Sequence, residues 1–124
     1  MMCHEYIRKE AMWWRLPVIV VEGPGNGYDA GEYIIYLTRE VYYGSDWRSL
    51  MIGLHELAHA YQHDRQTGLW LAWRYCPWFR RWLLRGVEGE ASRLAADWAW
   101  GTLPEKDIEV FQRENKTNYE DSPD

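Results

Sequence analysis

The stretch Leu54–His63, LHELAHAYQH, decides the fold that this sequence predicts. Within it, His55, Glu56 and His59 form the pattern H-E-x-x-H, which is typical of zinc-binding helices. Residues four apart lie on one face of an α-helix, with Cβ atoms about 5–6 Å apart, so both imidazoles can ligate one Zn²⁺. Glu56 follows the first ligand directly. We therefore expect Glu56 to act as the general base that takes a proton from a metal-bound water.

A continuous amphipathic helix is predicted around this pattern. Apolar residues recur there at steps of three and four: Trp47, Leu50, Met51, Leu54, Leu57, Ala58 and Tyr61. His55, Glu56 and His59 lie beside this stripe on a separate face. So short a pattern also arises by chance, and the helix would then carry two ordinary histidines. The separate face, together with a ligand candidate downstream, favours the metal site.

The third ligand is expected to be a carboxylate, because no histidine follows His63 in the sequence. His63 itself lies four residues past His59. Three ligands at four-residue steps along one straight helix spread too far to converge on one ion. We therefore expect His63 beside the site or on the surface.

Glu88 and Glu90 are the two candidates for that carboxylate. Glu88 shares a helical face with small residues, including Ser92 and Ala95, which let a second helix approach closely. Glu90 points elsewhere on the helix, where charge pairing with neighbours such as Arg93 explains it without a metal. Glu88 is therefore the predicted ligand and Glu90 the alternative. Ser92 is expected to hydrogen-bond one of the ligands.

Two blocks of sequence together resemble the gluzincin metallopeptidases: His55–Ala60, HELAHA, and Glu88–Ala96, EGEASRLAA. The second block is similar to the E-x-x-A-[DN]-R-x-A-A pattern of the HtpX-like and CAAX-processing membrane proteases. Their short relatives, the minigluzincins and the ImmA/IrrE-like proteases, share it. The resemblance covers about Tyr33–Trp100 and places Glu88 at the third ligand position. It places Ser92 where the family has Asp or Asn, a departure that weakens the expected hydrogen bond to a ligand histidine.

The resemblance implies a small α+β, zincin-like domain with a short twisted β-sheet, the H-E-x-x-H helix and a following glutamate-bearing helix. It implies one Zn²⁺ per chain and a zinc metalloendopeptidase that acts on a peptide or protein substrate. An edge strand beside the cleft would pair with that substrate, and Tyr33–Leu37 is the candidate for a strand near this edge. Tyr61 and Tyr75 are candidates for stabilising the oxyanion. The alternative is a catalytically weak or inactive zinc-binding interaction module that keeps the fold.

The remaining elements follow from periodicity and from turn residues. The sequence predicts a helix over Met1–Leu16, strands at Val18–Val21 and Tyr33–Leu37, a turn at Gly23–Gly27, a third strand or extended loop at Val41–Tyr43, and a helix over Val87–Trp100. Ser45 or Asp46 is expected to cap the metal helix, and Gly68 to mark its end or the loop that follows.

The whole chain of 124 residues is long enough for one domain. We expect that domain to span residues 1–103. Residues 104–124 form an acidic segment, with a short helix around Ile108–Phe111 followed by a loose tail. Either this segment or the N-terminal helix would make the protein latent if it covered the cleft.

The most unusual segment is Leu69–Arg85, LWLAWRYCPWFRRWLLR, which is rich in both aromatic residues and arginine. Pro77 is expected to divide it into two short helical pieces. A small domain must bury its aromatic rings, which favours an aromatic cap over the core. The alternative is a flap that contacts a membrane interface or a substrate.

Composition narrows the function further. The net charge of −5 argues against a nucleic-acid partner. Cys3 and Cys76 lack C-x-x-C spacing and are expected to be the reduced thiols of a cytoplasmic protein, with Cys3 as an inhibitory zinc ligand the minor alternative. The sequence shows neither a signal peptide nor a run of roughly 20 apolar residues. We therefore expect a soluble protein, whose oligomeric state the sequence does not predict.

Overall fold

The structure, a computed structural model, describes residues 1–100, 103 and 105–120. The fold is α+β, as predicted, with a small mixed sheet and six α-helices among the described residues. The elements are α1 (Cys3–Trp13), β1 (Ile19–Glu22), β2 (Gly27–Asp29), β3 (Ile34–Leu37), α2 (Arg39–Tyr43), α3 (Trp47–Arg65), α4 (Gly68–Tyr75), a 3-10 turn (Pro77–Phe79), α5 (Arg80–Ala99) and α6 (Glu105–Glu120). None of the described helices is long and apolar enough to cross a membrane.

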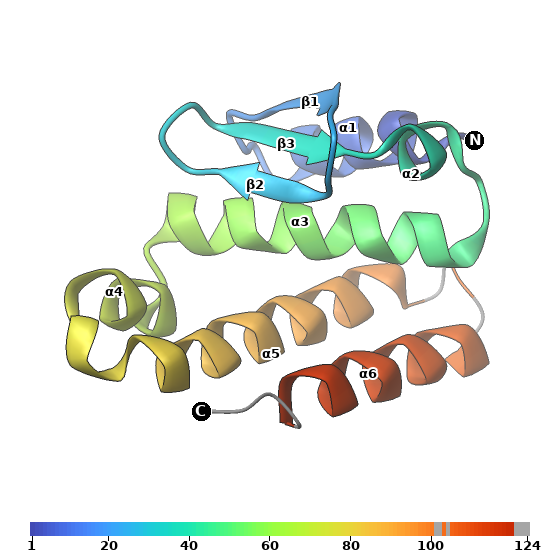
Figure 1. Ribbon diagram of the computed structural model, residues 1–124. Coiled ribbons are helices and arrows are strands. Elements are labelled where there is room, and N and C mark those ends of the chain that lie inside the picture. Colours follow the sequence, from blue (N-terminus) through green and yellow to red (C-terminus); the bar gives the residue numbers. More distant parts are fainter. Residues whose placement is uncertain (101–102, 104, 121–124) are drawn as a thin grey trace.

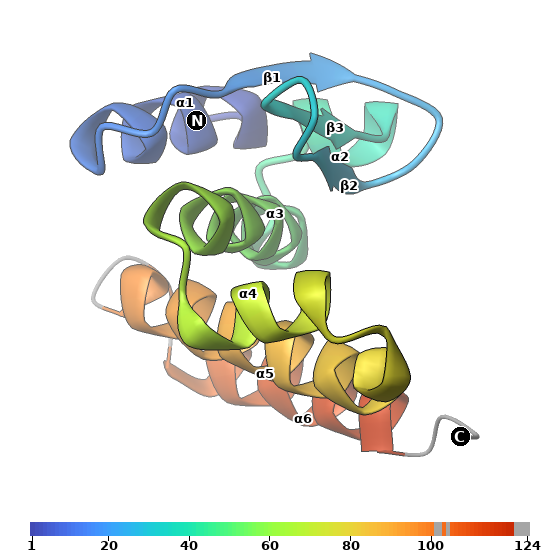
Figure 2. The same cartoon turned by 90° about the vertical axis from the view of Figure 1, so that its left-hand side faces the viewer.

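Helix α3 lies at the centre of the molecule. Figures 1 and 2 show the sheet, α1 and α2 on one side of it and α4, α5 and α6 on the other. Asp46 caps this helix as expected, with its side chain accepting hydrogen bonds from the Ser49 backbone N–H (3.4 Å) and hydroxyl (2.6 Å). Because α3 packs on both layers, most of its residues from Ser49 to Gln62 are buried.

The sheet has the order β1-β3-β2, with β1 parallel and β2 antiparallel to β3. The strand expected near the substrate edge, Tyr33–Leu37, is therefore the central strand, paired on both sides. The edge strand beside α3 is β2, which begins at the last residue of the predicted turn and was not predicted as a strand (Figure 1). The three residues of β2, the first of which is glycine, are too few to show the alternating pattern that predicts a strand.

Three other boundaries differ from the prediction. Val41 belongs to the five-residue helix α2 rather than to a strand, and its side chain is buried in the core. Helix α3 ends at Arg65 and is capped by Gln66, whose φ of 50° is left-handed, and Gly68 instead begins α4. After Pro77, the predicted short helical piece and the predicted last helix are one continuous helix, α5, of 20 residues.

Helix α6 is longer than the short helix expected in the acidic segment, with 16 residues from Glu105 to Glu120. Its apolar residues Ile108 and Phe111 are buried in the same core cluster as the residues of α3 and α5. The rest of the predicted tail, residues 121–124, lies outside the described residues. The acidic segment thus contributes buried side chains to the core and is not only a tail.

The aromatic segment is also different from the favoured interpretation. Trp70 is buried, but Tyr75, Trp78, Phe79 and Trp82 are all exposed. The prediction that this segment forms an aromatic cap over the core is therefore wrong for these four residues.

Gly53 and Cys3 hold α1 and α3 close together. A Cβ atom at Gly53 would lie 2.6 Å from Cys3 Sγ and 2.7 Å from Ile7 Cγ1. Cys3 is fully buried with Sγ 3.2 Å from the Ser49 carbonyl oxygen, and burial raises its pKa to about 12. This thiol therefore packs between α1 and α3, and it is not part of the cluster of His55, His59 and Glu88 that could hold a metal ion.

Replacing Gly53 by alanine is expected to lower the free energy of unfolding by about 1–3 kcal/mol, because the added methyl group overpacks this contact. Denaturation with urea measures the change. Gly25→Ala is the control, since a Cβ there meets nothing within 4 Å. Equal stability of the two variants would contradict the close packing of α1 on α3.

Candidate metal centre

The site forms where α3 and α5 pack together. Helix α3 carries His55, Glu56 and His59, all of them buried, and α5 carries Glu88. Three alanines of α5, Ala91, Ala95 and Ala99, are fully buried on the same side of the helix. Small side chains allow two helices to approach closely, so a carboxylate on one can reach the imidazoles on the other.

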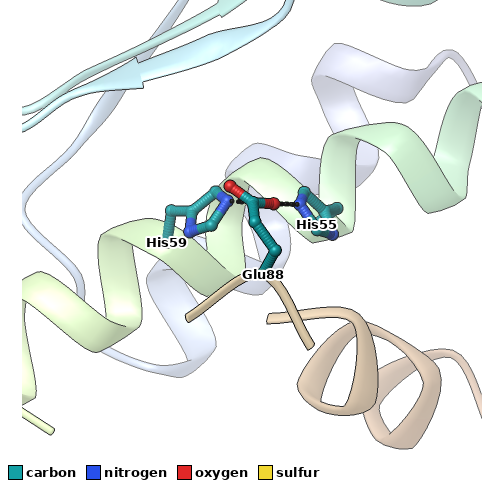
Figure 3. A group of neighbouring side chains, drawn as sticks. All are labelled: His55, His59 and Glu88. Carbon is teal, nitrogen blue, oxygen red and sulfur yellow. Dashed lines mark hydrogen bonds and ion pairs between the residues drawn. The ribbon is translucent and has the colours of Figure 1, made fainter. Parts of the chain in front are cut away.

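The two histidines converge on one oxygen of Glu88 (Figure 3). Glu88 Oε2 lies 2.7 Å from His55 Nε2 and 3.2 Å from His59 Nε2. The two imidazole rings are nearly perpendicular, with centroids 4.7 Å apart and an interplanar angle of 89°. The structure therefore brings together the three residues that the sequence predicted as ligands.

The electrostatics of the site favour a positive charge between these groups. Burial alone would raise the pKa of Glu88, but hydrogen bonds from His55 and His59 hold that pKa well below its usual range. Burial alone would lower the pKa of His59, but Glu88 and, more weakly, Glu56 raise it. The carboxylates thus stabilise a cation beside them, whether that cation is a proton on His59 or a metal ion.

The donor set fits a metal ion. One ligand atom from each of His55, His59 and Glu88 lies within 4.8 Å of the other two. Ligands about 2.0–2.1 Å from a tetrahedral ion stand roughly 3.3 Å apart, so the distances from Glu88 to the histidines need only small adjustments. Two imidazole nitrogens and one carboxylate oxygen suit zinc and other first-row divalent ions. These residues could therefore hold a metal ion, whose identity the geometry does not select.

Hydrogen bonds to the opposite ring nitrogens orient both histidines. Ser92 Oγ lies 3.3 Å from His55 Nδ1, as the sequence predicted, and Gln62 Oε1 lies 2.8 Å from His59 Nδ1. Partners of this kind hold the ring in place, and an acceptor such as Gln62 Oε1 also fixes which nitrogen carries the proton. With Nδ1 donating, each Nε2 is the nitrogen available to a metal.

Gln62 fixes the state of His59 because its own amide has no freedom to flip. Its Nε2 donates to the Val87 carbonyl oxygen and to Glu90 Oε1, both at 2.9 Å. Gln62 Oε1 must then be the acceptor, so His59 donates through Nδ1. Glu90 also accepts a hydrogen bond from Thr67 Oγ1 at 2.9 Å. Glu90, the alternative ligand, therefore accepts hydrogen bonds from Gln62 and Thr67. These bonds, rather than the predicted pairing with Arg93, fix the position of its carboxylate.

Glu56 lies beside the ligands and at the wall of a cavity. This cavity of about 420 Å³ is lined by Asn26, Arg48, Ile52, His55, Glu56, Glu88, Phe111 and Glu114. Oε2 of Glu56 is buried and has no hydrogen-bond partner among the described residues. Burial raises the pKa of Glu56, while the charges of His59 and His55 act in the opposite direction. A buried carboxylate beside three ligands has the position of a proton acceptor.

The other candidates lie elsewhere. His63 Nδ1 is 2.7 Å from the Tyr28 hydroxyl, and its ring packs against Trp70. Tyr61 packs between Trp14 and Trp98, with ring centroids 5.8 and 5.6 Å away. Tyr75 is the last residue of α4, and its side chain is exposed. His63 and Tyr61 are thus parts of aromatic clusters, and neither they nor Tyr75 lines the cavity.

Sequence reasoning missed Gln62 and most of the cavity wall. Gln62 stands three residues after His59, and i,i+3 spacing on a helix could have identified it. Arg48, one residue after the start of α3, and Glu114 in α6 form an ion pair of 3.0 Å at the cavity. No local pattern pairs residues so distant in sequence.

Replacing Gln62 by leucine is expected to weaken metal binding by about 10–100-fold, because His59 loses the partner that fixes its ring. Competition with a chromophoric chelator measures the affinity. Gln66→Asn is the control: it alters an exposed amide just after the end of the same helix, where asparagine tolerates the left-handed backbone. Unchanged affinity in Gln62→Leu would show that this hydrogen bond does not organise the site.

Comparisons with known proteins give no relative. No family model matches the chain, and neither a curated protein nor a solved structure matches it significantly. Function must therefore be argued from the site itself.

Proposed function

We propose that this protein is a zinc-dependent metallopeptidase of the gluzincin type, with one zinc ion per chain. The observation that carries the proposal is the convergence of His55, His59 and Glu88, from two helices, with Glu56 on the wall of the cavity that His55 and Glu88 also line. Two histidines with a glutamate, and an open fourth position, are the ligand set of zinc peptidases. The resemblance of the two sequence blocks to gluzincins supports the same proposal.

Different residues of the site have different roles in the proposed hydrolysis. Zinc, when bound, supplies a Lewis acid that polarises the scissile carbonyl and lowers the pKa of a water molecule. Glu56 takes a proton from the attacking water and returns it to the leaving amine as the peptide bond breaks. Gln62 and Ser92 keep the two imidazoles oriented through their Nδ1 atoms. No protein donor for the oxyanion is assigned, since Tyr61 and Tyr75 lie elsewhere.

The substrate is proposed to be an extended peptide that enters the cavity beside Glu56. Strand β2 is an edge of the sheet beside α3, and edge strands present unpaired N–H and C=O groups. Asn26, directly before β2, lines the same cavity as His55 and Glu56. A peptide paired with β2 would therefore pass the candidate metal centre.

Hydrolysis of an unfolded protein substrate by the zinc-loaded full chain tests the proposal. Mass spectrometry is expected to show new peptide termini, which a chelator prevents and added zinc restores. Absence of cleavage over a broad set of unfolded proteins and peptides, in protein shown to contain the metal, would contradict it.

The second candidate is a catalytically weak or inactive zinc-binding interaction module. The observation that favours it is the 3.3 Å separation of Ser92 Oγ and His55 Nδ1, a long hydrogen bond to a neutral hydroxyl. A carboxylate or amide at this position would orient the ligand more firmly. If this candidate is right, metal binding persists but no variant of Glu56 changes the protein's behaviour toward its partner.

The compartment that we propose is the cytoplasm. Cys3 and Cys76 are both free thiols, and free thiols persist in reducing compartments.

A further inference from the structure

The turn between α4 and α5 exposes an unusual concentration of aromatic rings. Within eight consecutive residues, Tyr75 is 68%, Trp78 85%, Phe79 60% and Trp82 69% exposed. We call these four residues, with Arg74, Arg80 and Arg81 beside them, the aromatic elbow. It lies at one end of the helical layer, where the chain turns from α4 into α5 (Figures 1 and 2). Exposed aromatic surface of this density marks a contact with a partner.

The elbow is also strongly positive in an acidic protein. Between Arg65 and Glu88 the sequence has four arginines and no acidic residue, although the chain carries a net charge of −5. Arg74, Arg80 and Arg81 are exposed. The Arg74 guanidinium lies 5.9 Å from the centroid of the Tyr75 ring, and that of Arg80 lies 5.5 Å from the centroid of the Trp73 ring. Positive charge and aromatic surface therefore occupy the same place.

We propose that the aromatic elbow docks on the surface of an anionic lipid bilayer. Tryptophan and tyrosine side chains favour the level of the lipid headgroups, because their rings are largely apolar and carry one polar group that can contact water. Arginines beside them can pair with headgroup phosphates and are attracted by anionic lipids. Such a surface lies on the bilayer and does not span it.

Charge separates this partner from a second copy of the chain. A two-fold contact through the elbow would place the same patch on both sides, so Arg74, Arg80 and Arg81 would face their own copies. Like charges brought together in this way oppose association. An anionic lipid surface has the complementary charge for the same residues.

Docking would hold the candidate metal centre close to the bilayer. Trp82 and Glu88 are both on α5, six residues and about 9 Å apart along the helix axis. Segments of protein near the membrane would then be presented to the cavity. The docking itself does not depend on the proposed peptidase, because neither the ligands nor Glu56 belongs to the elbow.

Flotation of the full chain with vesicles tests the proposal. Wild type is expected to float with vesicles that contain phosphatidylserine and to bind much less to pure phosphatidylcholine, with binding falling as salt is raised. The double variant Trp78→Ala, Trp82→Ala should lower the partition coefficient roughly tenfold or more, because it loses apolar contact with the bilayer. Each of Arg80→Gln and Arg81→Gln should weaken it about fivefold.

Matched controls separate the elbow from exposed residues in general. Trp13→Ala with Trp100→Ala removes two other exposed tryptophans, 78% and 63% exposed, and should leave flotation unchanged. Glu56→Gln should also float like wild type, so loss of catalysis and loss of docking are distinguishable. Wild type that does not float, or equal flotation of both double tryptophan variants, would overturn the proposal. So would a dimer in gel filtration that only the Trp78 and Trp82 substitutions abolish, since a second copy would then occupy the elbow.

Discussion

Replacing Glu56 by glutamine is expected to reduce peptide-bond hydrolysis by about 10²–10⁴-fold, the usual contribution of general acid–base catalysis. The substitution removes the proton acceptor but keeps the size of the side chain. The structure places Glu56 at the cavity beside His55 and Glu88, with its Oε2 unpartnered among the described residues. Initial rates of cleavage under substrate-saturating conditions, for wild type and variant at equal metal content, measure the effect.

The control for this variant is metal content, because Glu56 is not one of the three ligands. Glu56→Gln should bind metal with the same stoichiometry as wild type. If the variant cleaves as fast as wild type while retaining the metal, Glu56 is not the base. If neither protein cleaves, the interaction module becomes the better account of the site.

Replacing Phe111 by alanine is expected to lower the free energy of unfolding by about 3 kcal/mol, which is typical of a buried phenylalanine. Phe111 is 6% exposed and, with Ile108, attaches α6 to the core. Removing residues 104–124 should therefore destabilise the protein rather than simply uncover a latent active site. Denaturation with urea, followed by circular dichroism, measures both changes.

Arg48→Gln is the control for the position of α6. The Arg48–Glu114 ion pair is about half exposed on both sides, so breaking it should change stability by less than about 1 kcal/mol. A truncated protein that stays as stable as wild type and gains activity would contradict the structural role of α6 and would support latency.

The part of the site that the sequence predicts is the part that helical geometry encodes. His55 and His59 are four residues apart on one helix, so their common face follows from the spacing. Glu88 was separated from Glu90 by the small residues on its face, and those residues are indeed buried against α3. The strands β1 and β3 and the cap at Asp46 follow from equally local patterns.

The features that the sequence did not predict depend on contacts between distant segments. Strand β2 exists because β3 pairs with it, not because three residues favour a strand. Helix α6 is placed by burial of Ile108 and Phe111 against other helices. Burial of the aromatic rings was expected from the small size of the domain. That argument does not apply to rings such as Trp78, which lies on a turn and is left exposed by all of the described elements.

Metal content by elemental analysis tests the central claim most directly. Wild type, Glu88→Gln and Glu90→Gln are matched, since the same substitution is made two residues apart and the second keeps an acceptor for Gln62. We expect about one zinc ion per chain in wild type and Glu90→Gln, and little in Glu88→Gln, because an amide oxygen is a poor zinc ligand. Wild type that takes up no metal when supplied with it, or Glu88→Gln that binds as well as wild type, would contradict the candidate metal centre.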